Sequence, residues 1–201
     1  MKRALAAMLL AAAATAGASA QTQPPALVAA AAAYAKITGY KTTAHVYQVK
    51  GTDTQNSVYD YTFTKPTSVS MNIVSGANSG ATVTWTGGTS VRAGKGMFTK
   101  TVDLTDPLVL SLRGMTIVQL SFGSILQHAA ETAGTLTAST TTLGGATVNL
   151  VNLDVANPQG DNGLTREVLY LSQSTNLPVR VDGFVGATLV QTVSFENTST
   201  T

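Results

Sequence analysis

The stretch VYDYTFTKPTSVSMNIVSG, residues 58–76, alternates large apolar and polar side chains on both sides of a Lys65-Pro66 pair. The apolar phase consists of Tyr59, Tyr61, Phe63, Val69, Met71 and Ile73. A period of two is typical of strands with one buried face, and proline interrupts the pairing of a strand. The stretch therefore predicts two neighbouring strands joined at Lys65-Pro66, with an apolar face that needs cover.

The same period recurs over most of the chain, interrupted by turn-rich segments such as NPQGDNG and SQSTNLP. Strands are expected at residues 40–50, 58–64, 67–75, 81–86, 89–93, 97–102, 146–155, 164–172, 178–184 and 187–196. The first two flank a predicted hairpin turn at residues 51–57. Such short spacings predict a meander of antiparallel strands.

Two segments have helical character instead. Residues 26–37 are rich in strong helix formers and precede Gly39, which is expected to act as the C-cap. Residues 103–134 show helical spacing in places, so one or two helices are expected there, with a break near Arg113-Gly114. In that segment Pro107 suits a helix start and Gly134 a helix end.

Residues 21–201 contain no repeat, linker or charge block, so they are expected to form one domain. The predicted class is mainly β (α+β): a strongly curved antiparallel sheet with an N-terminal helix and mid-chain helices. Two helical pieces cannot cover a sheet of nine or more strands. The sheet is therefore expected either to close and fill with side chains, or to stay partly open with helices over an apolar cavity.

The first twenty residues have the features of a cleaved export signal. Lys2 and Arg3 precede an apolar run that is too short to span a bilayer, and Ala18-Ser19-Ala20 fits the cleavage rule. The predicted location is therefore periplasmic or secreted. The chain has no cysteine, so neither disulfides nor a lipid-bearing cysteine is expected, and no later segment is apolar enough to be an integral membrane span.

Composition argues against several classes of function. Without Lys2 and Arg3, the ten remaining basic residues balance the ten acidic ones. Only 11% of residues are charged, against about 25% in an average globular protein. The basic footprint of nucleic-acid binding is missing, so nucleic acid is not an expected partner.

No catalytic residue, metal ligand or cofactor is predicted. His45 and His128 are the only histidines, and neither has a carboxylate or a second histidine at the spacing of a metal site. Ser124 lacks the motif of a nucleophile elbow, and Gly94-Lys95-Gly96 lacks the rest of a phosphate loop. A Ser-His-Asp group assembled only in space stays open as an alternative.

The order of several segments resembles the LolA/LolB-like lipoprotein carriers. After the N-terminal helix come YKTTAHVYQVKG, then the basic-Pro junction in FTKPTSVSMNI, then TVTWTGGTSVRA. Mid-chain, LTDPLVLSLRGMTIVQLSFGSILQHAA corresponds to the family's helices, and EVLYLSQSTNLPVRVDGF corresponds to its late strand, turn and strand. The resemblance implies an eleven-stranded half-open barrel with lid helices over its mouth and an apolar interior that holds acyl chains.

The resemblance also implies site residues. In the carriers an arginine before the proline latches the lid. Here that position is Lys65, which lacks the planar fork of arginine. The expected rim or latch residues are Lys65, Arg92 and Arg113. The expected cavity lining is Tyr59, Tyr61, Phe63, Val69, Met71, Ile73, Trp85, Met97, Met115, Leu120, Phe122 and Leu126, although the same residues also suit an ordinary packed core.

The predicted function is a non-catalytic binding or carrier protein for lipid or lipoprotein acyl chains. An acceptor protein at the inner or outer membrane is an expected partner. Two alternatives stay open: a lipid-sensing regulatory module on the same scaffold, and a secreted structural β-protein with a filled core.

Overall fold

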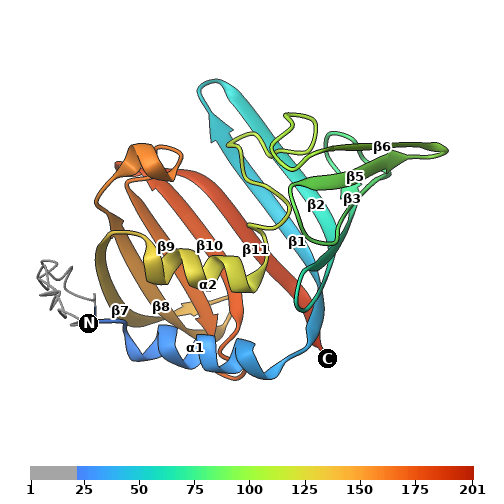
Figure 1. Ribbon diagram of the computed structural model, residues 1–201. Coiled ribbons are helices and arrows are strands. Elements are labelled where there is room, and N and C mark those ends of the chain that lie inside the picture. The colour runs from blue at the N-terminus through green and yellow to red at the C-terminus, as the bar shows by residue number, and fades with distance from the viewer. Residues whose placement is uncertain (1–21) are drawn as a thin grey trace, which may run out of the picture.

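The computed structural model describes residues 22–201, so the predicted export signal, residues 1–20, lies outside the described residues. These residues form one curved sheet of eleven antiparallel strands with two α-helices on its concave side (Figure 1). The strands are β1 (Gly39–Lys50), β2 (Asp53–Thr64), β3 (Ser68–Ser75), β4 (Ala81–Trp85), β5 (Ser90–Lys95), β6 (Phe98–Asp103), β7 (Gly134–Leu143), β8 (Ala146–Val155), β9 (Arg166–Ser172), β10 (Pro178–Val185) and β11 (Thr188–Thr200). The predicted half-open barrel is confirmed.

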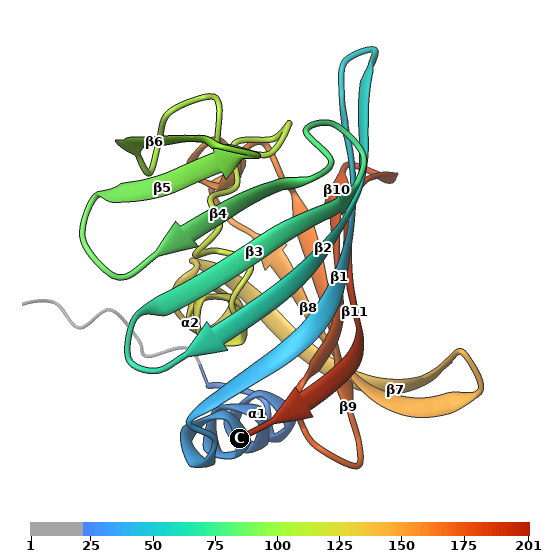
Figure 2. The same cartoon turned by 90° about the vertical axis from the view of Figure 1, so that its right-hand side faces the viewer.

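The strand order joins two meanders. It runs β6-β5-β4-β3-β2-β1-β11-β10-β9-β8-β7, so the first and last strands of the chain pair in the middle of the sheet. In Figure 2 the sheet curves from the β5–β6 hairpin round to β7. The chain crosses between the meanders through residues 104–121, which we call the lid segment, and helix α2 (Phe122–Glu131). Figure 2 shows both inside the curve of the sheet.

Helix α1 (Pro25–Lys36) places Leu27 and Ala30 in the core and packs against α2 and β8. The two helices approach closely at Gly123. A Cβ there would lie 2.7 Å from the hydroxyl oxygen of Tyr34 in α1, so a larger residue would push the helices apart. Gly39 is not the cap that the sequence predicted, because α1 ends in an extended Ile37 and Gly39 already belongs to β1.

Two strand predictions are wrong. Residues 53–57 belong to β2 and not to a turn, because polar Thr54, Gln55 and Asn56 pair with β1 in a hairpin that turns at Gly51-Thr52. Strand β7 was not predicted at all. It is a threonine-rich edge strand with mostly exposed side chains, so it lacks the apolar alternation by which a strand is recognised in sequence.

The helical prediction for residues 103–134 is correct only for α2. The lid segment consists of turns, and Asp106-Pro107 starts no helix. Gly114 has a φ of 84°, outside the helical region. Several backbone N–H groups of the segment also donate to side chains rather than to a carbonyl four residues earlier. Of the one or two helices expected here, the structure has one, and an irregular segment precedes it.

The concave core centres on an aromatic stack. The rings of Tyr40 in β1 and Phe122 in α2 are parallel within 3°, with centroids 4.0 Å apart, and Phe195 meets Phe122 edge-on. The Tyr40 hydroxyl accepts a hydrogen bond from the Phe122 backbone N–H at 2.9 Å. Burial raises the pKa of Tyr40, so the phenol stays neutral. This contact attaches the start of α2 to the sheet.

Replacing Tyr40 with Phe should destabilise the fold by about 1–3 kcal/mol, because the buried Phe122 N–H loses its acceptor while the ring stack is kept. Urea unfolding followed by circular dichroism measures the change. The control is Tyr47→Phe on the same strand, where the side chain is partly exposed and a change of at most about 0.5 kcal/mol is expected. Equal effects at the two positions would contradict the assigned role of the Tyr40 hydroxyl.

Candidate functional site

The larger cavity lies between the first four strands and the lid segment, and we call it the lid cavity. Its volume is about 430 Å³. Its buried wall includes Val46, Tyr59, Met71, Val83, Ile117 and Leu120. Its exposed rim includes Thr54, Asn56, Ala77, Asn78 and Leu108. The lid cavity is thus apolar inside and mixed at its rim.

Two glutamines hold the lid segment against the sheet. The Gln55 side-chain oxygen accepts from the Leu112 N–H at 2.7 Å, and the Gln48 oxygen accepts from the Arg113 N–H at 3.0 Å. Gln48 is fully buried and also donates to the side chain of Gln191 at 2.8 Å. A buried polar group needs such partners, and here they come from a backbone without regular structure. The glutamines therefore stabilise an irregular cover.

Two further contacts hold the same segment. The Tyr61 hydroxyl donates to the Ile117 carbonyl at 3.1 Å, inside the core. The Arg113 guanidinium donates to the carbonyl of Val49 at 2.8 Å and to that of Asn162 at 2.7 Å. Arg113 thus ties the lid segment to β1 and to the loop between β8 and β9. Its predicted role at the rim stays a prediction.

A smaller cavity of about 100 Å³ lies between α2 and strands β8–β11, and we call it the helix cavity. Its wall is largely apolar, with Ile125, Val151, Leu169 and other core residues, but one end is polar. Met115 and Leu120 line both cavities. These two side chains therefore separate one apolar space from the other.

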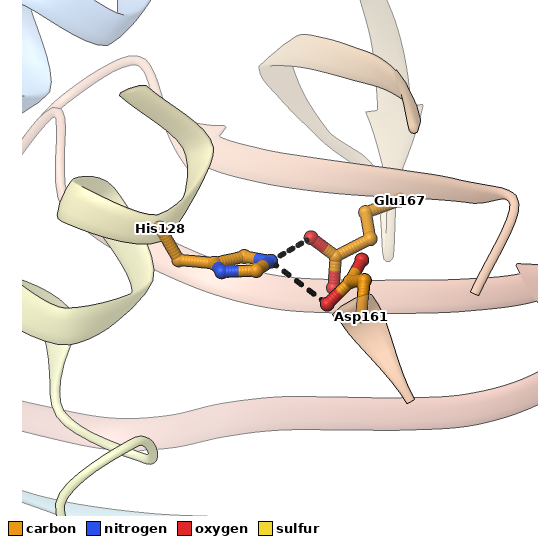
Figure 3. A group of neighbouring side chains, drawn as sticks. All are labelled: His128, Asp161 and Glu167. Atoms are coloured by element: carbon orange, nitrogen blue, oxygen red, sulfur yellow. Dashed lines mark ion pairs between the residues drawn. The ribbon is translucent and has the colours of Figure 1, made fainter. Parts of the chain in front are cut away.

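The polar end of the helix cavity contains a cluster of charged side chains, which Figure 3 shows. Nε2 of His128 on α2 lies 2.8 Å from a Glu167 oxygen and 3.3 Å from an Asp161 oxygen. Asp161 ends the 3-10 helix η1 (Pro158–Asp161), and Glu167 lies on β9. Hydrogen bonds to Asp161 and then Glu167 raise the pKa of His128 to about 10, against the opposing effect of burial. The imidazole is therefore a cation at neutral pH.

Lys65 contacts α1 rather than the lid segment. Its ammonium donates to the Tyr34 carbonyl at 2.6 Å and to the Ala35 carbonyl at 3.3 Å, and it lies 4.2 Å from the centre of the Tyr34 ring. A cation at the last carbonyls of a helix is favourable because it completes their hydrogen bonds and complements the helix dipole. The basic residue before the proline thus holds a helix, and that helix is α1.

Five of the twelve predicted lining residues line the lid cavity: Tyr59, Met71, Ile73, Met115 and Leu120. The other apolar ones pack in the core and line neither cavity: Tyr61, Phe63, Val69, Trp85, Phe122 and Leu126. Strand alternation alone cannot separate these groups, because both face the same side of the sheet. Whether a side chain meets another side chain or a cavity depends on where the lid segment lies.

Two predicted positions are wrong. Met97 lies at the tip of the β5–β6 hairpin and is 96% exposed, so it lines no cavity. Arg92 is exposed on β5 next to buried Val91, and neighbouring strand residues point to opposite faces, so it lies on the outer face and not at the rim.

Sequence reasoning missed Gln48, Gln55 and the partners of His128. The burial of Gln48 could have been predicted from the sequence, since Gln48 follows Ala44 and Val46 in the apolar phase of β1. The cluster could not, because Asp161 and Glu167 follow His128 by more than thirty residues. The sequence prediction assigned neither histidine a carboxylate partner, yet in space His128 meets Asp161 and Glu167. His45 lies 3.5 Å from Glu196, at the surface.

No model of a protein family matches the sequence, and no curated protein sequence matches it either. Several solved structures, however, are similar to this chain in fold. MucB is similar with a TM-score of 0.50 at 12% identity, covering 87% of this chain and 57% of the MucB chain. At that identity the likeness shows a shared fold only, and the chain spans little more than half of MucB.

Two further similar structures carry the family name that the sequence suggested. A putative outer membrane lipoprotein-sorting protein domain from Vibrio parahaemolyticus has a TM-score of 0.46, and a LolA superfamily protein from Nitrosomonas europaea has one of 0.43. Each is 10% identical and covers 87% of this chain and 91% of its own. At 10% identity these likenesses, like that to MucB, concern the fold alone.

Replacing Lys65 with Met should lower the free energy of unfolding by about 1 kcal/mol, because the α1 carbonyls lose a charged donor. Lys65→Arg should keep most of that stability. Lys36→Met, at an exposed position of the same helix end, is the matched control. Urea unfolding measures all three, and a loss at Lys36 equal to that at Lys65 would count against the capping role.

The His128 contacts predict a pH dependence of stability. The folded-state pKa, about 10, lies above the ordinary value of 6.5, so the stabilisation is complete below about pH 6.5 and is lost as the pH rises through 10. Urea unfolding between pH 6.5 and 10 should show this decline, and His128→Gln should remove it. NMR titration, with His45→Gln to assign the two imidazoles, gives the pKa directly; an ordinary value for His128 would contradict the contacts.

Proposed function

We propose that the protein binds lipid or lipoprotein acyl chains in the lid cavity and carries them, without catalysis, outside the cytoplasm. The observation that supports this most is the cavity itself: an apolar space of about 430 Å³ under an irregular cover. Ligand sites commonly have volumes of about 300–1,000 Å³. Among residues 22–201, neither helix is long and apolar enough to span a bilayer.

Burial supplies the binding energy in this mechanism. Each methylene group moved from water to the apolar wall contributes about 0.8 kcal/mol. Met71 and Met115 are unbranched and flexible, so they can adapt to chains of different shape. The mixed rim, with Asn56 and Asn78, leaves a polar head group in contact with water.

Entry and release require the lid segment to move. A small number of side-chain hydrogen bonds join it to the sheet. Gln48, Gln55 and Tyr61 bond to its backbone, and its own Arg113 donates to β1, whereas a helix would have a continuous ladder. Such a cover opens by breaking a few hydrogen bonds while the sheet stays intact. A shift of Met115 would also join the lid cavity to the helix cavity and lengthen the available space.

The cavity favours this proposal over a secreted structural protein with a filled core. A lipid-sensing module would use the same cavity, and only delivery separates the two. A carrier should pass a bound fluorescent fatty acid to acceptor vesicles faster than the fatty acid leaves by itself, whereas a sensor should retain it. Transfer that never exceeds spontaneous release would argue for the sensor.

Two adjacent residues of β3 provide the test of the binding site. Ile73 lines the lid cavity, whereas Val74 points to the opposite face and is 51% exposed. Ile73→Trp should fill the cavity and weaken binding of a fluorescent fatty acid by at least about tenfold, or 1.4 kcal/mol. Val74→Trp should bind as the unchanged protein does. Equal affinities for all three proteins would place the ligand elsewhere.

A further inference from the structure

The charged cluster at the polar end of the helix cavity draws on three separate elements. His128 lies on α2, Asp161 ends η1, and Glu167 lies on β9. Figure 3 shows the imidazole and both carboxylates pointing toward one another. One ligand atom from each of the three side chains lies within 4.8 Å of the other two. The fold thus brings one imidazole nitrogen and two carboxylate oxygens close together.

The charges of this cluster do not balance. The side chains of Asp161 and Glu167 are only 9% and 11% exposed, and one imidazolium faces both. The single Nε2 proton is shared between two carboxylate oxygens. The second Asp161 oxygen, Oδ2, is buried and has no hydrogen-bond partner within residues 22–201. Because a buried polar atom normally has a partner, the unpaired Asp161 oxygen leaves room for a further cation or donor at this cluster.

The donor set is one that transition metals use. Imidazole nitrogen and carboxylate oxygen both bind Zn²⁺ at about 2.0–2.1 Å, and many zinc sites have three protein ligands with a fourth position open. Ligands at tetrahedral angles then lie roughly 3.3 Å apart. The observed separations are 3.3 Å from Nε2 to the Asp161 oxygen and 2.8 Å to the Glu167 oxygen. The two separations from Nε2 are thus close to those of a tetrahedral site, and the second is somewhat shorter.

The orientation of the imidazole suits a metal ligand. Figure 3 shows Nε2 facing both carboxylates. The hydroxyl oxygen of Thr132, one turn further along the chain, lies 3.2 Å from Nδ1 and 3.5 Å from Nε2, and therefore beside the ring. Nε2 is the ring nitrogen in position to bind an ion together with the two carboxylates.

We propose that His128, Asp161 and Glu167 bind a divalent transition-metal ion, preferably Zn²⁺, through Nε2 and one oxygen of each carboxylate. The ion takes the place of the Nε2 proton, which leaves to solvent, and so adds one net positive charge beside the two carboxylates. Its fourth position faces the helix cavity, whose lining includes these three residues. Ca²⁺ and Mg²⁺ bind less well, because they prefer six or more oxygen ligands. The site is independent of acyl binding in the lid cavity.

Isothermal titration of the chelator-treated full chain with ZnCl₂ tests the proposal. One ion should bind per chain. Asp161→Asn and Glu167→Gln keep the side-chain shapes and should each weaken binding by at least about 100-fold, as should His128→Gln. His45→Gln is the matched control, because it removes the other histidine–carboxylate pair, at the surface, and should leave the affinity unchanged.

Two further measurements keep the result interpretable. Circular dichroism shows whether each variant is folded, and Co²⁺ added to the unchanged protein should give the intense visible absorption of a four-coordinate site. Zinc binding that survives Asp161→Asn and Glu167→Gln, or that is lost equally in His45→Gln, would overturn the proposal. So would the failure of the unchanged protein to bind Zn²⁺, or a Zn²⁺ affinity no higher than that for Mg²⁺.

Discussion

Phe122 stacks on Tyr40 and donates its backbone N–H to the Tyr40 hydroxyl, and the cover of the concave face depends on this contact. An open sheet of eleven strands cannot bury its inner face by itself. The contact attaches α2 at the join of the two meanders, beside the pairing of β1 with β11. From that point α2 covers the second meander and the lid segment covers the first. The lid cavity lies under the lid segment, and the helix cavity lies under α2 and the end of that segment.

The two parts of the cover are held by different physical means. Helix α2 satisfies its own backbone and needs anchors only at its ends, which are Phe122 at the start and His128 near the finish. The lid segment has no regular hydrogen-bond ladder, so the sheet must supply acceptors and donors, and Gln48, Gln55 and Tyr61 do so. Burial of these polar side chains is favourable only while the segment is in place. These hydrogen bonds thus stabilise the closed arrangement of the lid segment. Because they are few, the segment can open when only these bonds break.

Strand periodicity in the sequence correctly predicted the curved antiparallel sheet, the buried phase of residues 58–76 and the junction at Lys65-Pro66. It did so because alternation reports which face of a strand is buried. It missed β7, whose threonines are exposed on both faces at the sheet edge. It also assigned helix to the lid segment, because the spacing of apolar residues there reflects packing against a curved sheet and not a helical face.

The sequence by itself determined the class of fold, the inward phase of strands such as β2 and β3, and the low fraction of charged residues, since these follow from local patterns and composition. Only the tertiary structure decided which inward residues meet a cavity, that Lys65 binds the end of α1, and that His128 meets Asp161 and Glu167. These contacts join segments that are far apart in the chain. Local patterns report the direction in which a side chain points, whereas the partner that it meets there depends on how the elements pack.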